Sequence, residues 1–245
     1  MKNTSRPKRN LDATVAGART QTSVAVEKLR AEIISGHLPP NEKLRVQFLT
    51  QRYGLAASSI REALSRLVTD GLVEVEDQRG FRVSPVSRDD LEDLTETRVG
   101  IESMALTRAI EYGDVAWESD VIGAYHRLSR CEEPTAPITP DAQHWAACHR
   151  DFHRSLIAAC RSEWLLYFCD VLYEQSDRYR MLTIYLHTHP RNAPKEHEDL
   201  MNAVIRRDAP LACALLRAHF WETTRQILGV DEAIGGLGQK SLAPA

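Results

Sequence analysis

Two histidines four residues apart, His149 and His153, are the side chains of this sequence that are best spaced to share a metal ion. On a helix this spacing places both imidazoles on one face. His197 and His219 lie in two later helical segments, and nothing in the spacing alone brings them to the first pair. Histidine pairs also arise by chance, and the chain holds 9 histidines, so packing without coordination stays open as the alternative.

The helix that carries this pair does not favour hydrolytic chemistry. A catalytic metal site keeps an open coordination position and usually has a nearby general base. His149 is followed by Arg150, whereas metalloproteases of the His-Glu-x-x-His type carry a glutamate there. Asp151 lies two residues from each histidine and points roughly to the other side of the helix, so we expect it at the surface or beside a ligand. We predict a binding site and no enzyme.

The elements that must position these histidines are all helical. From residue 88 to about residue 228 the apolar residues recur only with the helical period, and the breaks between segments are short. Ser87 is expected to cap the first helix through Asp90, and Asp208 precedes the last helix, which has proline in its first turn. This half of the chain should form a helical bundle. The predicted helices cover residues 88–112, 115–131, 141–160, 162–187, 193–207 and 209–228.

The first third of the chain has a different pattern, a short helix after a tight turn. Its apolar residues from Ile60 to Val68 form one stripe, which leaves a basic face of small side chains outside. Gly54 ends the preceding helix, and Ser58 or Ser59 can cap the new one, with Ser59-x-x-Glu62 as a capping box. This is a helix-turn-helix pattern, and the capped end of the second helix enters a DNA major groove. The outward residues are Ser58, Arg61, Glu62, Ser65 and Arg66.

Two short strands are predicted directly after this helix, around a turn at Gln78-Arg79-Gly80. Two earlier helices, at about 23–35 and 46–53, complete a three-helix core. The fold class is therefore mainly α, with an N-terminal winged helix-turn-helix followed by an all-helical bundle. The expected divisions are a disordered basic arm (1–22), the DNA-binding domain (23–86), the all-helical domain (87–229) and a flexible tail (230–245).

Charge and composition agree with this division. The net charge is −3, but residues 1–85 hold 14 Lys and Arg against 9 Asp and Glu, net +5, and the remainder holds 17 against 25, net −8. Basic side chains supply most non-specific affinity for DNA, so the positive half fits a nucleic-acid partner. No apolar run approaches a membrane span and no signal peptide is evident, so we expect a cytoplasmic protein. The 5 cysteines include no Cys-x-x-Cys pair, and we assign them no role.

Several short motifs occur together in residues 23–86: Gly36-x-Leu38-Pro39-Pro40-x-x-Lys43-Leu44, Tyr53-Gly54-Leu55, Ile60-Arg61-Glu62-Ala63-Leu64-x-x-Leu67, Gly71-Leu72-Val73 and Arg79-Gly80-Phe81-x-Val83. Jointly they resemble the GntR family of bacterial transcription regulators. Where that family usually has Ser-Arg-Thr-Pro, this chain has Ala56-Ala57-Ser58-Ser59, so an arginine that commonly contacts DNA is missing. Base readout should then rely more on Arg61, with Arg45 and Arg66 as the alternatives. The other expected DNA contacts are Arg45, Ser58, Ser59, Arg66, Arg79 and Gly80.

The helical half carries a second set of motifs: Asp90-Leu91-x-Asp93-Leu94-x-Glu96-x-Arg98-x-x-Ile101-Glu102, Phe152-His153-x-x-Leu156, Glu196-His197 and Asp208-x-x-x-Ala212 leading to His219. These resemble the FCD domain, the effector domain of the FadR subgroup. The resemblance implies that the all-helical bundle of residues 87–229 is an effector-binding and dimerisation domain. Many members bind a metal through Asp-x-x-x-His on one helix and one histidine on each of two later helices. The resemblance implies that His153, His197 and His219 are metal ligands, with His149 at the aspartate position.

This exchange of a carboxylate for His149 has physical consequences. A carboxylate ligand contributes one negative charge and imidazole contributes none, so four histidines would leave the full charge of a divalent ion. Such a site should attract an anionic effector more strongly and favour Zn or Ni over Mg, Ca or Mn. The alternative is that His149 packs without coordinating and water fills its place.

Taken alone, Arg98 would be expected to be a solvated helix residue. The resemblance implies instead that it faces the effector pocket, where it could hold a carboxylate in bidentate fashion. Within the subgroup, local phrases are similar to the CsiR/GlaR branch, whose effector is the dicarboxylate glutarate. These phrases are Lys43-Leu44-Arg45, Ala57-Ser58 ahead of Arg61-Glu62-Ala63-Leu64, and Gln78-Arg79-Gly80-Phe81.

We therefore expect a homodimeric repressor that binds a roughly palindromic double-stranded DNA operator. A small organic acid, in particular a dicarboxylate, would bind the metal and Arg98 and lower the affinity for DNA. Two alternatives remain at this point. One is a metal-dependent enzyme with an appended DNA-binding domain, and the other is a constitutive DNA binder with a structural metal.

Overall fold

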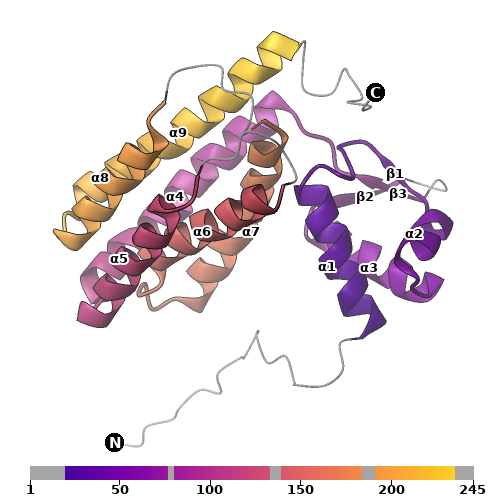
Figure 1. The fold of residues 1–245 in the computed structure, drawn as a ribbon, viewed down its shortest axis with the longest axis horizontal. Coiled ribbons are helices and arrows are strands. Elements are labelled where there is room, and N and C mark those ends of the chain that lie inside the picture. Colours follow the sequence, from indigo (N-terminus) through magenta and orange to yellow (C-terminus); the bar gives the residue numbers. More distant parts are fainter. Residues whose placement is uncertain (1–19, 77–79, 133–138, 184–190, 235–245) are drawn as a thin grey trace, which may run out of the picture.

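The computed structural model describes residues 20–76, 80–132, 139–183 and 191–234. They form two parts that lie side by side, a small N-terminal domain of helices and short strands and a larger helical bundle (Figure 1). The N-terminal arm and the C-terminal tail predicted from the sequence lie outside these ranges, except for residues 20–22 and 230–234.

The N-terminal domain is a winged helix-turn-helix. Three helices enclose an apolar core whose fully buried members include Leu29, Ile60 and Leu64. An antiparallel sheet with the order β1-β3-β2 closes one side, and its β2–β3 register runs from Val73 opposite Val83 to Glu76 opposite Gly80. The elements are α1 (Gln21–Ile34), β1 (Lys43–Leu44), α2 (Val46–Tyr53), α3 (Ala57–Thr69), β2 (Val73–Glu76) and β3 (Gly80–Val83).

The start of α3 corrects one prediction. The helix begins at Ala57 with Ala56 as its N-cap, and no side chain bonds to its first turn from that position. The capping box of Ser59 and Glu62 is therefore wrong. The Glu62 carboxylate instead accepts a hydrogen bond from the Thr22 hydroxyl, and the backbone N–H of Ala56 donates to the Gln21 side chain. Contacts from α1, which begins two residues earlier than expected, replace the local cap.

The bundle consists of helices joined by short breaks, as the periodicity predicts. Ser87 caps α4 and accepts a hydrogen bond from the backbone N–H of Asp90 at 3.2 Å. At the start of α9 the Asp208 carboxylate accepts from the backbone N–H of Leu211. α9 continues to residue 234, beyond the predicted end at 228. The elements are α4 (Arg88–Tyr112), α5 (Val115–Ser129), α6 (Pro140–Ile157), α7 (Glu163–Thr183), α8 (Ala193–Ile205) and α9 (Ala209–Ile234).

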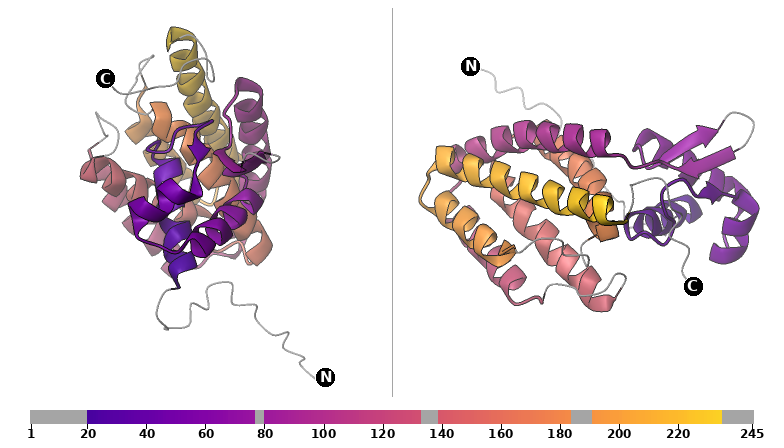
Figure 2. Two further views of the ribbon diagram at one scale, coloured as in Figure 1. Left: turned by 90° about the vertical axis from the view of Figure 1, so that its right-hand side faces the viewer. Right: turned by 90° about the horizontal axis from the view of Figure 1, so that it is seen from above.

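A small third core joins the two parts. Val86 of the linker packs with Leu91 at the start of α4, Tyr179 near the end of α7, and Ile227 and Leu228 of α9. Figure 2 shows the linker running from the sheet directly into α4, while α7 approaches the N-terminal domain. A disturbance of α7 therefore reaches the linker through packed side chains. Among the described residues, no helix is long and apolar enough to cross a membrane.

Candidate metal centre and DNA-binding face

The four predicted histidines converge inside the bundle. His149 and His153 come from α6, His197 from the first turn of α8 and His219 from the middle of α9, and all four side chains are buried. One ring nitrogen of each lies within 4.8 Å of those of the other three. Asp151 is exposed and takes no part in the cluster, as its helical position predicts.

The hydrogen bonding of the cluster fits a metal ion. Both ring nitrogens of His153 and Nε2 of His197 are buried without a hydrogen-bond partner among the described residues. An unsatisfied buried nitrogen costs free energy, and a metal ion bound by one nitrogen of His153 and by Nε2 of His197 would satisfy two of the three. Nitrogen donors at this spacing suit a borderline cation such as Zn²⁺ or Ni²⁺.

Two of the histidines are oriented by neighbours outside the cluster. Nδ1 of His219 lies 2.8 Å from a carboxylate oxygen of Glu196, and Nδ1 of His149 lies 3.0 Å from the Tyr173 hydroxyl. Arg191 Nη2 also lies 3.0 Å from Nδ1 of His219, but it already donates to the Glu196 carboxylate at 2.6 Å. We therefore assign the Nδ1 proton of His219 to the bond with Glu196. Its Nε2 lone pair is then available to a metal, the usual role of a carboxylate behind a ligating histidine.

Burial lowers the pKa of all four histidines. It is the largest cause in each case, and repulsion by neighbouring histidines and arginines adds to it. The pKa of His197 falls to about 4 from an ordinary value of 6.5. The imidazoles are therefore neutral at neutral pH, which is the form that binds a metal ion.

The metal-free protein should lose stability as the pH falls below about 6.5. The unfolded chain then takes up protons on these histidines while the native cluster does not, so acid favours unfolding. Each such histidine contributes about 1.4 kcal/mol per pH unit, and the window for His197 extends down to about pH 4. Urea unfolding of the chelated protein across this range measures the slope. His197→Ala should make the slope of stability against pH shallower, and His126→Ala, at an exposed site, should leave it unchanged. Equal slopes in the two variants would contradict a lowered pKa of His197.

Guanidinium groups surround the cluster. Arg98 is buried, and its Nε donates to the Glu102 carboxylate at 2.8 Å while Nη1 donates to the Ser176 hydroxyl at 2.8 Å. Its charge lowers the pKa of His153 and His219, so it lies beside the cluster. The positive charges of Arg180 and Arg191 act on the histidines in the same way. Each of the three guanidinium groups is paired with a carboxylate, of Glu102, Asp177 or Glu196, so an anion that binds one of them must replace that carboxylate.

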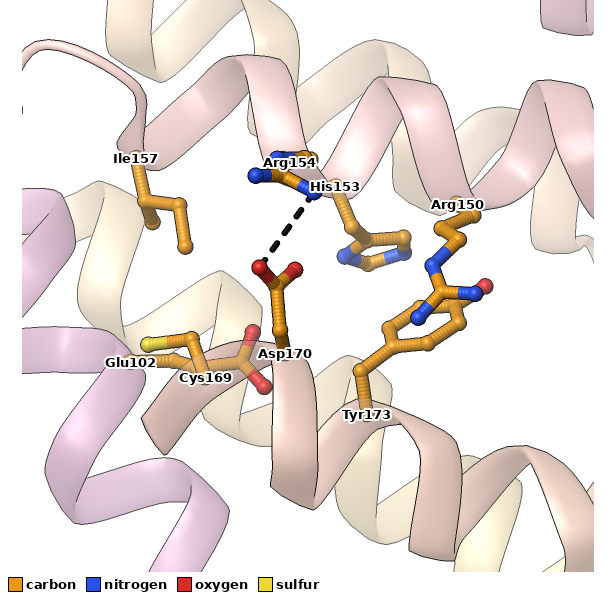
Figure 3. Close-up of a pocket in the computed structure, with 8 residues that line it drawn as sticks. All are labelled: Glu102, Arg150, His153, Arg154, Ile157, Cys169, Asp170 and Tyr173. Atoms are coloured by element: carbon orange, nitrogen blue, oxygen red, sulfur yellow. Dashed lines mark ion pairs between the residues drawn. The ribbon is translucent and has the colours of Figure 1, made fainter. Parts of the chain in front are cut away.

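A small cavity borders His153 between α4, α6 and α7 (Figure 3). Its volume is about 10 Å³, room for roughly one water molecule. Glu102 and Asp170 place carboxylates at one side, and burial raises the pKa of Glu102. A molecule larger than water does not fit into this space as it stands.

The outward face of α3 presents the predicted DNA contacts. Ser58 and Arg61 are exposed, as is Arg45 at the start of α2, while Ser59 is half-buried beside Gln21. The Arg66 guanidinium donates to Glu62 on the same helix at 2.6 Å, so this ion pair must be exchanged before Arg66 can contact DNA. Arg79 falls outside the described residues. Gly80 has φ of +99°, a conformation that favours glycine at this end of the wing.

Several functional residues were not predicted from the sequence. Tyr173 and Arg180 lie seven residues apart, on one face of α7, but polar side chains occur on all sides of this helix, so the spacing gave no clear signal. Glu196 was named only as part of the Glu196-His197 motif, and its contact with His219 was not predicted. Arg191 follows a proline break, and its position between α8 and α9 has no signature in sequence spacing.

Two protein families and several known proteins are similar to this chain. The family described as bacterial regulatory proteins of the gntR family matches residues 21–83, and the FCD domain matches residues 93–221. The chain is 41% identical to the HTH-type transcriptional regulator BphR of Paraburkholderia xenovorans, over 84% of each chain. It is 36% identical to the HTH-type transcriptional repressor GlaR of Escherichia coli, over 78% of this chain and 88% of that protein. The solved structure of E. coli McbR/YncC superposes with a TM-score of 0.70 at 19% identity, covering 85% of this chain and 97% of that one.

Proposed function

The chain belongs to the gntR family of bacterial regulatory proteins and is a DNA-binding transcription regulator with an FCD domain, and we propose that a small carboxylate bound at a metal ion controls its operator affinity. Since its domains and relatives are those of transcription regulators, it is a regulator rather than an enzyme. One observation carries the proposal. Four buried neutral imidazoles converge on a space that is bordered by guanidinium groups.

The metal ligands in this proposal are His149, His153, His197 and His219. A bound divalent ion would supply a centre of positive charge, and four neutral ligands would leave that charge uncompensated. The donor set supports Zn or Ni rather than Mg, Ca or Mn.

The effector in this proposal is a small organic acid, in particular a dicarboxylate. One carboxylate would be attracted to the metal centre, and a second would meet the guanidinium groups around it. Arg98 is the first candidate for this second contact, and it must then loosen its pair with Glu102. A neutral ligand would gain nothing from either charge.

The signal would travel along α7, which touches both parts of the protein. Tyr173 contacts His149, and the next residue, Glu174, pairs with Arg30 of α1. Gln175 then donates to the backbone carbonyl of Asp70 at the end of α3, at 2.6 Å. Successive residues of one helix touch the metal centre and the DNA-binding domain. A displacement of α7 would therefore disturb both sets of contacts together.

The linker is held by the same helix. Arg178 Nη1 donates to the Ser84 carbonyl at 3.5 Å and Nη2 to the Pro85 carbonyl at 3.0 Å. The Tyr179 hydroxyl contacts the backbone N–H of Ser87 and the Asp90 carboxylate. An effector that favours a different position of α7 would therefore change the orientation of the DNA-binding domain.

Arg178→Ala and Gln175→Ala should weaken the coupling between acid binding and DNA binding. Both variants should still bind the acid, but the acid should change their DNA affinity less than the 5- to 150-fold range that is typical of allosteric coupling. Fluorescence anisotropy with an operator selected from random duplexes, with and without the acid, measures this change. Arg217→Ala removes an exposed ion pair with Glu96 and serves as the control. Full coupling in both test variants would exclude α7 as the route.

We also propose that two copies associate through α7. Trp164 is 65% exposed, Tyr167 and Phe168 are each 45% exposed, and their ring centroids lie 5.5–6.2 Å apart. An exposed aromatic cluster of this kind is typical of an interaction surface. A second copy is the partner that a helix-turn-helix protein needs in order to occupy both half-sites of a palindromic operator.

Trp164→Glu should shift the protein from dimer to monomer at micromolar concentration, because the charge must be buried in the contact. Sedimentation velocity measures the change, and operator affinity should fall with it. Val115→Glu introduces the same charge at an exposed apolar position on α5. A dimer that persists in the Trp164 variant as it does in this control would place the interface elsewhere.

The proposed function is tested by thermal unfolding against small mono- and dicarboxylic acids, on the protein as purified and after chelation. An acid at about 100 times its dissociation constant adds about 2.7 kcal/mol to the native state. A shift that disappears on chelation is the expected result. No shift with any acid in either state would remove the carboxylate proposal and favour a constitutive DNA binder with a structural metal.

A further inference from the structure

A second group of potential metal ligands lies where α5 ends and α6 begins. Cys131 follows the last turn of α5, and His144 and Cys148 are four residues apart on α6. Their ligand atoms all lie within 4.8 Å of one another, and Cys148 Sγ lies 3.8 Å from His144 Nε2. The function proposed above does not use any of the three.

This group is separate from the histidine cluster. Consecutive residues on an α-helix differ by about 100° in direction, so Cys148 and His149 point to different sides of α6. His144 is exposed and Cys131 is half-buried, which leaves the group open to solvent, whereas all four clustered histidines are buried.

The spacing of the donors suits a tetrahedral ion. Zinc bonds of about 2.3 Å to sulfur and about 2.0 Å to nitrogen put two sulfurs about 3.8 Å apart and a sulfur and a nitrogen about 3.6 Å apart. The observed 3.8 Å between Cys148 and His144 is close to this value. The three side chains can therefore meet one ion with small rotamer changes.

We infer that Cys131, His144 and Cys148 form a second metal site, which takes a thiophilic cation such as Zn²⁺. Two thiolates and an imidazole select zinc and similar ions over Mg²⁺ or Ca²⁺. Three protein ligands leave a fourth position for water. Binding releases the thiol protons to solvent and joins the end of α5 to the start of α6, across the connection between them.

A disulfide between Cys131 and Cys148 is the competing use of the same thiols. A cation supplies the charge that stabilises the thiolate, and the third donor, His144, has a role in metal binding but none in a disulfide.

The test is a titration of the reduced, chelated, full-length protein with Co²⁺ as a spectroscopic probe. Cobalt bound to thiolate gives a sulfur-to-metal charge-transfer band in the near ultraviolet, which a histidine site cannot give. The wild type should show this band, and Cys131→Ser and His144→Ala should each lose it together with one bound ion per chain. Cys213→Ser, a half-buried cysteine outside the group, should retain it.

The band also separates this inference from the proposed function. His153→Ala should keep the band while losing the ion of the histidine cluster. Absence of the band in the wild type, or the same intensity in Cys131→Ser, would overturn the second site. A Cys131–Cys148 disulfide found by peptide mapping without reductant, together with no band after reduction, would assign the pair to redox chemistry instead.

Discussion

His153→Ala should remove the metal ion and, with it, every response to a small acid. His153 lies between two of the other ligands, with ring centroids 4.5 Å from His149 and 5.1 Å from His219. Loss of a partner that only orients a ligand costs 10- to 100-fold in metal affinity, so loss of a ligand should cost more than about 100-fold. The stabilisation of about 2.7 kcal/mol expected from metal at 100 times its dissociation constant should then disappear.

Metal content by emission spectroscopy and the zinc-induced shift in unfolding temperature measure this loss. The shift is compared rather than the unfolding temperature itself, because removing a buried ring also leaves a cavity. His126→Ala, at an exposed position on α5, should behave as the wild type. His149→Ala then separates the two possible ligand sets, since unchanged metal content and acid affinity would make His149 a packing residue. His153→Ala should lose one ion per chain and keep any ion held by Cys131, His144 and Cys148, so a metal content equal to that of the wild type would place the first ion outside the histidine cluster.

Arg61→Ala should lower operator affinity by about 1–3 kcal/mol, or roughly 5- to 150-fold. Arg61 is exposed on the outward face of α3 and makes no ion pair within the described part of the chain, whereas Arg66 is paired with Glu62. With alanines at positions 56 and 57 no other arginine stands at the start of this helix. The loss of base readout therefore cannot be compensated by a neighbour.

Arg61→Lys is the matched control for the role of this residue. Lysine keeps the charge but cannot form the bidentate contact that an arginine makes with guanine. If it restores affinity for random DNA but not for the operator, Arg61 reads a base. Wild-type operator affinity in Arg61→Ala, measured at the same salt concentration, would show that Arg61 makes no contact of consequence.

Local signals in the sequence predicted most of the fold. The apolar period gives α4 its observed bounds, and the hydroxyl of Ser87 and the carboxylate of Asp208 mark helix starts that the structure contains. β1 was missed because a strand of two residues has no period to detect. The cap of α3 was misplaced because the helix begins earlier, at Ala57, and because residues distant in sequence bind its start: Gln21 accepts from the backbone N–H of Ala56, and Thr22 donates to the Glu62 carboxylate.

The candidate metal site was predictable only in part. Helical spacing places His149 and His153 on one face, but their meeting with His197 and His219 depends on how three helices pack. That grouping came from the family resemblance. The contacts of Tyr173, Arg191 and Glu196 are also tertiary, as is the approach of Cys131 to Cys148 from another element. Spacing along one helix carries no information about such partners.

The volume of the cavity beside His153 also bears on the speed of the response. At about 10 Å³ it admits roughly one water molecule, so an acid that binds beside His153 needs the bundle to open. Collective motions of helices take microseconds or longer, and binding that needs such a change is slower than a diffusional encounter. The observed rate of acid binding should then level off as the acid concentration rises, at the rate of bundle opening.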